Sequence, residues 1–243
     1  MAGKKKGRER ASGERLAKLS TLFAGFAHEV RNPLSTIGLN LGLIKEDFAD
    51  AGSTRDKRTY KRLSILESEV KRLESILDEF LRYVRTPELN LRPTDLNGFL
   101  QNVVDFSGPE MQEKGISLRF YPGQDVGKLL IDVNLLRAAL VNLLRNAREA
   151  CAKGDEILVS TQRLGEDLAI QVTDTGPGMD EQQQQQAFRP YFSTKKSGTG
   201  LGLSITRRIV EEHGGTIELN AEKDTGTQFT IRLPAESKAA EAP

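Results

Sequence analysis

The glycines of this chain are concentrated in one segment, and their order is typical of a phosphate-binding site. Seven of the 22 glycines lie between Gly176 and Gly215. An early group follows Asp174 at the end of an apolar run, and a later group leads directly into a helical pattern at Leu203. A glycine-rich turn that opens a helix exposes backbone N–H groups to an anion, and the helix dipole assists its binding. Taken singly, the early group could be only a turn and the later group only a flexible linker.

The segment between these two glycine groups combines aromatic and basic side chains. Its aromatic residues are Phe188, Tyr191 and Phe192, and Lys195 and Lys196 follow them. A long loop with aromatic anchors and cations could cover a bound anion and exclude water. We therefore predict a lid over the glycine-rich site.

Histidine and cysteine are scarce, which removes several kinds of site. The chain has two histidines, His28 and His213, and one cysteine, Cys151. A disulfide framework within the chain and a zinc cluster of Cys and His ligands are therefore excluded. Because His213 ends an apolar helical pattern and precedes two glycines, we predict that it is a structural residue at a helix C-terminus.

The composition narrows the classes of partner. The 35 basic and 34 acidic residues leave a net charge of +1, which gives no indication of a nucleic-acid partner or an anionic membrane. The longest charge-free run, residues 32–44, is far shorter than the roughly 18 apolar residues of a membrane helix. No apolar signal segment follows the basic start, so we predict a cytoplasmic protein without membrane insertion. Residues 1–13, a basic arm, and residues 236–243, a small polar tail, are predicted to be disordered.

Two apolar stripes with helical spacing occupy the first third of the chain. The first consists of Leu16, Leu19, Phe23, Phe26, Val30, Ile37, Leu41, Ile44 and Phe48. The second consists of Leu63, Leu66, Val70, Leu73, Leu77, Phe80 and Val84, at the alternating three- and four-residue steps of a coiled coil. The polar segment 50–54 predicts a turn between two antiparallel helices. Because a lone hairpin would leave much of both stripes in water, we predict a homodimer with a four-helix bundle.

The pattern changes after Pro87 and Pro93, which mark a boundary because proline disfavours a continuing helix. Helical patterns cover residues 96–114, 133–151 and 201–213, and strand patterns cover 116–121, 157–161, 168–172, 216–219 and 227–233. Residues 182–186, all glutamine, predict a polar helical face. The strands come mostly in adjacent pairs, which favours a two-layer α/β sandwich over a parallel sheet. The predicted fold class is therefore α+β, a helical hairpin followed by such a sandwich.

Two asparagines lie one turn apart on the helix predicted at 133–151. Asn142 and Asn146 would share a face of it, and alone such a pair is equally consistent with a solvated polar stripe. Their place in a larger order is more specific. Four segments resemble the N, G1, F and G2 boxes of histidine-kinase catalytic domains, whose superfamily includes gyrase-type ATPases and heat-shock chaperones. The segments are 142–147 (NLLRNA), 174–178 (DTGPG), 188–192 (FRPYF) and 198–203 (GTGLGL).

This resemblance implies a Bergerat-type ATP site. By the family pattern, Asp174 receives the adenine amino group, and Gly176 and Gly178 allow the backbone to approach the base and ribose. Asn146, supported by Asn142, would hold Mg²⁺, for which an amide oxygen is a suitable hard ligand. The phosphates would be held by Lys195 and by the turn formed by Gly198, Thr199, Gly200, Leu201 and Gly202.

The chain departs from the family pattern at two positions. Glu149 stands where many relatives carry a basic residue, so phosphate contacts from this helix would fall to Arg145 or Arg148. In the late turn before Gly226, Asp224 stands where relatives often have glycine.

A further segment, 26–34 (FAHEVRNPL), resembles the H box of the dimerisation and phosphotransfer domain. If Phe23 and Val30 are core positions of a heptad, His28 takes the outermost position. An exposed histidine alone could be an idle surface residue, but the H box implies a phosphoryl acceptor. A neutral imidazole with an ordinary pKa of ~6.5 has a free lone pair for attack. The family assigns proton removal to Glu29 and the orientation of a hydrolytic water to Asn32.

Together these segments imply a sensor histidine kinase of a two-component system. Residues 14–87 would form the dimerisation and phosphotransfer domain, and residues 88–235 the catalytic ATP-binding domain. The expected activity is autophosphorylation of His28 from ATP, followed by transfer to an aspartate in the receiver domain of a response regulator. A signal would come from a separate sensory protein, or directly through the arm and bundle. The alternatives are a GHKL-type ATPase without autokinase activity and a phosphatase or scaffold acting on the regulator, which Asn32 would permit.

Overall fold

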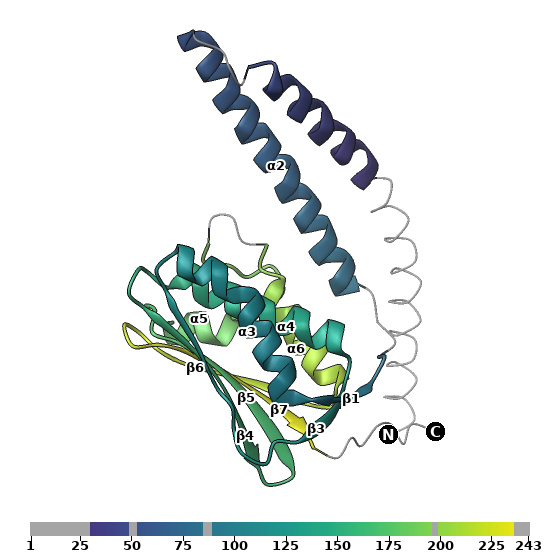
Figure 1. The fold of residues 1–243 in the computed structure, drawn as a ribbon, viewed down its shortest axis with the longest axis vertical. Helices are drawn as coiled ribbons and strands as arrows, with labels where there is room; N and C mark the ends of the chain where they lie inside the picture. Colours follow the sequence, from purple (N-terminus) through teal and green to yellow (C-terminus); the bar gives the residue numbers. More distant parts are fainter. Residues whose placement is uncertain (1–29, 49–52, 85–88, 196–198, 236–243) are drawn as a thin grey trace. The chain divides into compact units, whose positions relative to one another are not determined.

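The computed structural model describes residues 30–48, 53–84, 89–195 and 199–235 (Figure 1). The chain forms two compact units, Met1–Pro87 and Glu88–Pro243. No helix among the described residues is long and apolar enough to cross a membrane.

The first unit contains two helices, one over residues 30–46 and the other, α2, over Thr54–Val84. Helix α2 begins after Ser53, whose hydroxyl oxygen accepts the Asp56 N–H at 3.1 Å. This bond satisfies one of the amides that a helix start leaves unpaired.

The two helices run antiparallel. The Ser35 hydroxyl donates to Glu74 at 3.0 Å, and Lys45 Nζ lies 2.8 Å from Glu67. Later residues of the first helix thus contact earlier residues of α2, which confirms the predicted hairpin.

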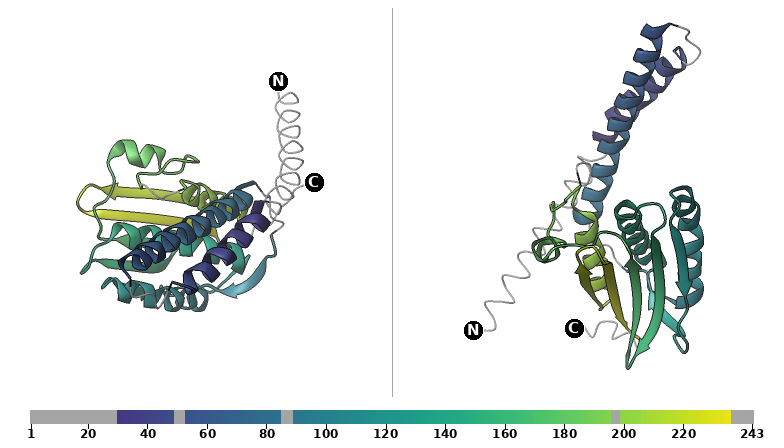
Figure 2. Two further views of the ribbon diagram at one scale, coloured as in Figure 1. Left: turned by 90° about the horizontal axis from the view of Figure 1, so that it is seen from above. Right: turned by 90° about the vertical axis from the view of Figure 1, so that its left-hand side faces the viewer.

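The second unit is a two-layer sandwich. Its sheet has the order β2-β4-β5-β7-β6, with β2 parallel to β4 and the other pairs antiparallel. Helices α3, α4 and α6 cover one face of this sheet (Figures 1 and 2). The helices are α3 (Leu96–Glu113), α4 (Val133–Ala150), α5 (Glu181–Gln186) and α6 (Gly202–Glu212). The strands of the sheet are β2 (Ser117–Tyr121), β4 (Glu156–Leu164), β5 (Asp167–Asp174), β6 (Thr216–Glu222) and β7 (Gly226–Pro234).

The core lies between these two layers. Helix α4 contributes Leu136, Leu140, Leu143 and Leu144, which are almost fully buried and share one face of the helix. Ile157, Ile170 and Ile231 face them from three adjacent strands of the sheet. The predicted α+β class, the three long helices and the five strands of the sheet are confirmed.

The sequence did not predict a small second sheet. Strands β1 (Arg92–Asp95) and β3 (Lys128–Ile131) pair antiparallel, with Pro93 opposite Leu130. Four-residue strands give little periodicity, and Pro93 indicated a boundary instead. Proline is tolerated here because this ribbon has only two strands, both of which are edges.

Candidate functional site

The carboxylate of Asp174 lies buried at the end of β5. Its side chain is 5% exposed, and Oδ1 accepts the Gly176 N–H at 3.0 Å. Burial raises its pKa, and Asp155 acts in the same direction, whereas the amides of Gly176 and Thr227 and the Lys195 ammonium oppose the shift. A carboxylate has several acceptor positions, so Asp174 can also accept from a ligand amino group.

Glycine is required in the loop that follows Asp174. Gly178 has a φ of +68°, and a Cβ there would overlap the carbonyl oxygen of Glu222. The loop is joined to the β6–β7 turn because the Asp224 N–H donates to the Pro177 carbonyl at 2.8 Å. Asp224 itself has a φ of +62°. This explains why glycine suits that position and why aspartate, which tolerates this conformation better than most residues, can replace it.

Asn142 lies between α4 and α6. Its side-chain amide donates to the Thr206 hydroxyl at 3.0 Å and its Oδ1 accepts from Arg145 at 3.1 Å. A Cβ at Gly202 would overlap Asn142 Oδ1, so glycine at the first residue of α6 allows the Asn142 side chain to keep its position and its bond to Thr206. Asn142 therefore holds the first part of α6, which follows the glycine-rich turn, against α4. Thr206 was not among the predicted residues, since only the fold brings it beside Asn142.

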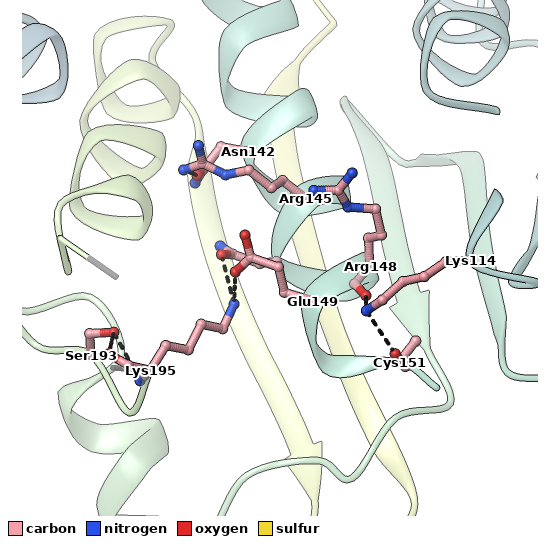
Figure 3. A network of polar contacts seen from close by, with 9 residues as sticks. Lys114, Asn142, Arg145, Arg148, Glu149, Cys151, Ser193 and Lys195 are labelled. Carbon is pink, nitrogen blue, oxygen red and sulfur yellow. Dashed lines mark hydrogen bonds and ion pairs between the residues drawn. The ribbon is translucent and has the colours of Figure 1, made fainter. Parts of the chain in front are cut away.

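The next turn of α4 carries Asn146 and Glu149, and both contact Lys195 (Figure 3). Lys195 Nζ forms an ion pair with the Glu149 carboxylate and lies 3.5 Å from Asn146 Oδ1. The Ser193 hydroxyl accepts the Lys195 backbone N–H at 3.1 Å. The basic segment before residue 196 is thus tied to the helix that presents the two asparagines.

Arg145 and Arg148 of α4 have protein partners. Arg148 forms an ion pair with Glu110 of α3. Arg145 donates to Asn142, and Figure 3 shows both side chains. Next to them, Lys114 donates to the carbonyl oxygens of Arg148 and Cys151 at 2.7 and 3.3 Å. Burial raises the pKa of the Cys151 thiol to about 11, so this cysteine is not an active nucleophile.

The aromatic segment is anchored to the glycine-rich turn. The Tyr191 N–H donates to the Gly200 carbonyl at 3.0 Å, and Gly200, at a φ of +70°, leaves no space for a Cβ against the Tyr191 backbone. Phe188 packs edge-on against Phe229 with a centroid distance of 6.2 Å, and the Arg207 guanidinium lies 3.9 Å from its centroid. Among the three aromatics Tyr191 is the exposed one.

The G2-like turn is partly described. Thr199 Oγ1 accepts the Leu201 N–H at 3.3 Å, and Leu201, which is buried, precedes the first residue of α6. Gly198 lies outside the described residues. So do His28 and Glu29 of the H-box-like segment. Asn32 is described and exposed on the helix of residues 30–46.

His213 has the structural position predicted for it. Its Nε2 accepts the Asp132 N–H at 3.0 Å, and its Nδ1 lies 2.7 Å from the Ile209 carbonyl oxygen. These partners require the neutral tautomer with its proton on Nδ1. Asp132 also caps α4, because its carboxylate accepts the N–H groups of Asn134 and Leu135.

The donor set near Asn146 is compatible with a magnesium ion held mainly by phosphate. The described residues contain no group of three or more His, Cys, Asp or Glu side chains that could hold a metal. Asn146 Oδ1 is a hard oxygen donor, and Mg²⁺ commonly takes one or two protein ligands together with substrate phosphates and water.

Comparison with known proteins gives two family matches, one in the N-terminal part of the chain and one in its C-terminal part. Residues 18–88 match the His Kinase A (phospho-acceptor) domain, and residues 131–237 match the histidine kinase-, DNA gyrase B- and HSP90-like ATPase family. The sensor histidine kinase ZraS of Escherichia coli (strain K12) is 35% identical over 223 residues, which cover 91% of this chain and 46% of ZraS. The chain thus spans about half the length of this curated relative.

Two solved histidine kinases have a similar structure. ShkA in complex with AMPPNP is 27% identical with a TM-score of 0.72, covering 90% of this chain and 46% of ShkA. ThkA in complex with the response regulator protein TrrA is 28% identical with a TM-score of 0.69, covering 97% of this chain and 67% of that one. With both domain matches in the expected order, the chain belongs to the sensor histidine kinases and carries a phospho-acceptor domain followed by an ATP-binding domain.

Proposed function

We propose that this chain transfers the γ-phosphoryl group of ATP to His28 and then to an aspartate of a response regulator. The observation that carries the proposal is the presence, on one chain, of a phospho-acceptor domain match and an ATPase-domain match. Asp174, Asn146 and Lys195 belong to one site in the second unit. Lys195 contacts Asn146, and its positive charge opposes the rise in the pKa of Asp174.

In this proposal Asp174 accepts the adenine amino group, and the loop through Gly176 and Gly178 borders the base. Burial favours this role because a hydrogen bond to a carboxylate is stronger where water is excluded. Asp174 and the α4–α6 interface at Asn142 are held by hydrogen bonds within the protein, so little ordering would be required on binding.

The phosphates would lie between the second part of α4 and the turn before α6. The proposed donors there are the Lys195 ammonium and the N–H groups near Gly200 and Gly202, and Asn146 would hold Mg²⁺. The metal supplies neutralisation of phosphate charge. Phosphoryl transfer mainly requires positioning and charge compensation, which these residues can provide.

At the acceptor, an imidazole nitrogen of His28 forms the new bond to the γ-phosphorus while the bond to the β–γ bridging oxygen breaks and ADP leaves. The proton on the other ring nitrogen passes to Glu29. Both residues lie in the segment that matches the phospho-acceptor domain. By helical spacing Asn32, four residues after His28, would share its face, which supports a role in orienting water for hydrolysis of the phosphorylated regulator.

Exposed apolar side chains in the first unit support a homodimer. Leu66 and Leu73 are about half exposed on α2, and Leu39 on the first helix is 67% exposed. Val70, in contrast, is nearly buried within the hairpin. A second copy would cover such a face in a four-helix bundle.

The structure of ThkA with TrrA supports a receiver domain as the partner. A separate sensory protein and a cytoplasmic location remain predictions from the sequence.

Labelling with γ-phosphate-labelled ATP tests the proposed autokinase activity. The wild-type chain should acquire phosphate that is stable to alkali and labile to acid, as expected of phosphohistidine. The His28→Gln variant should bind nucleotide normally and remain unlabelled. Label on that variant would place the acceptor elsewhere, and nucleotide binding without label on the wild type would favour an ATPase or a regulator phosphatase.

A further inference from the structure

Glu149 and Lys195 form an ion pair at the phosphate end of the proposed ATP site. Lys195 contacts Glu149 and Asn146 of α4 together (Figure 3). The same ammonium is a proposed donor to the phosphates, and the same Asn146 oxygen is the proposed magnesium ligand. One lysine therefore lies between the residues that should receive the charged end of the nucleotide.

Lys195 can exchange partners without a change in the backbone near it. Its backbone N–H is bonded to Ser193 Oγ, and the Ser193 hydroxyl also donates to the Lys195 carbonyl at 3.3 Å. The side chain beyond this local turn is flexible and ends in a point charge with three donors. The lysine and glutamate side chains are 36% and 39% exposed, so water can replace either partner.

A carboxylate and a triphosphate are competing anions for this ammonium. The triphosphate carries more negative charge and would draw Lys195 away from Glu149. Glu149 would then lose its cation while standing one helical turn from Asn146. This opposes binding, because the ion pair must be broken before Lys195 can reach the phosphates.

We propose that Glu149 is a competing counter-ion that holds Lys195 and thereby weakens nucleotide binding at this site. The inference rests on the proposed function and deepens it, because it names the residue that sets how readily nucleotide enters and leaves. Glu149 is a positioning residue, acting on the nucleotide through Lys195.

Calorimetric titration of the full chain with AMPPNP and Mg²⁺ tests the proposal without any phosphoryl transfer. Glu149→Gln keeps the shape of the side chain and removes its charge. Its dissociation constant should fall by about two- to fivefold, the size expected for a partly exposed ion pair. In a Lys195→Gln background, the same change at Glu149 should leave the constant within experimental scatter.

Glu218→Gln is the matched control, because Glu218 pairs with Arg232 on the sheet and the substitution changes the net charge equally. It should leave the dissociation constant unchanged. Equal tightening by Glu218→Gln, or equal tightening by Glu149→Gln with and without Lys195, would show a general charge effect and overturn the proposal. Unchanged or weaker binding by Glu149→Gln would also overturn it. A wild-type chain that binds no AMPPNP would contradict the proposed function itself, which distinguishes the two failures.

Discussion

The two ends of the proposed nucleotide site are held in different ways. At the end around Asp174 and Gly178, a buried carboxylate and a loop with no space for a side chain fix the geometry. At the end around Glu149 and Lys195, a partly exposed ion pair holds it. Backbone overlap cannot be relieved by a change of rotamer, whereas an exposed ion pair contributes about 1 kcal/mol or less. The first end is suited to recognising one shape, and the second to exchanging charged partners.

The largest test of this difference is Gly178→Ala. A Cβ at this φ is strained and would overlap the Glu222 carbonyl, so the second unit should lose roughly 2–5 kcal/mol of unfolding free energy. Urea unfolding followed by circular dichroism measures it. Gly165→Ala is the matched control, because Gly165 has a φ of +64° with open space around it, and only about 1–2 kcal/mol of strain is expected. Equal losses would mean that overlap with β6 does not matter.

The pH dependence of stability gives a smaller test at the same end. Because the folded chain raises the pKa of Asp174, this group's stabilising contribution is present at acid pH and is lost as pH rises through its folded pKa. Relative to Asp174→Asn, the wild type should therefore become less stable as pH rises, in urea unfolding at a series of pH values.

Asp132 provides the opposite case in the same unit. Its burial alone would raise the pKa, but hydrogen bonds from the amides of Leu135, Asn90 and Asn134 to its carboxylate outweigh this and lower the pKa. Its contribution is present above the unfolded pKa and is lost as pH falls through the folded pKa. Relative to Asp132→Asn, the wild type should gain stability as pH rises, and the same sign at both positions would refute this contrast.

The smallest effect is expected at the ion pair. Lys195→Gln should change the unfolding free energy by no more than about 1 kcal/mol, since the pair is partly exposed and screened by salt. Thermal unfolding with and without added salt measures it. A loss as large as that of Gly178→Ala would mean that this end is also held by packing, and the comparison would fail.

The sequence predicted those parts of the site that depend on local order. The spacing of the glycines predicted the two turns, because Gly178 and Gly200 have a positive φ and no space for a Cβ. The strand pattern before Asp174 predicted its position at the end of a strand. The sequence could not pair Asn142 with Thr206, which is 64 residues away and meets it only because α4 packs on α6.

The departure at Glu149 was visible in the sequence, but its partner was not. Lys195 is 46 residues later, and only the packing of its loop on α4 brings the two charges together. The ribbon of β1 and β3 was missed for a related reason, since its two short strands acquire their pairing from the fold and not from periodicity.

The hydrogen bond between Asp132 and His213 also determines how a mechanical force on the chain is transmitted through the second unit. The Asn90 N–H donates to Asp132 Oδ2 at 3.0 Å. The Asp132 carboxylate also caps α4, and its backbone N–H donates to His213, which follows the last residue of α6. Tension on the chain at Asn90 would therefore reach the N-terminus of α4 and the C-terminus of α6 through a single residue. Sliding α6 along α4 would require breaking the bond at His213 and the bond of Asn142 to Thr206. Because these hydrogen bonds join the two helices at two points, a force transmitted along the chain would move α4 and α6 together.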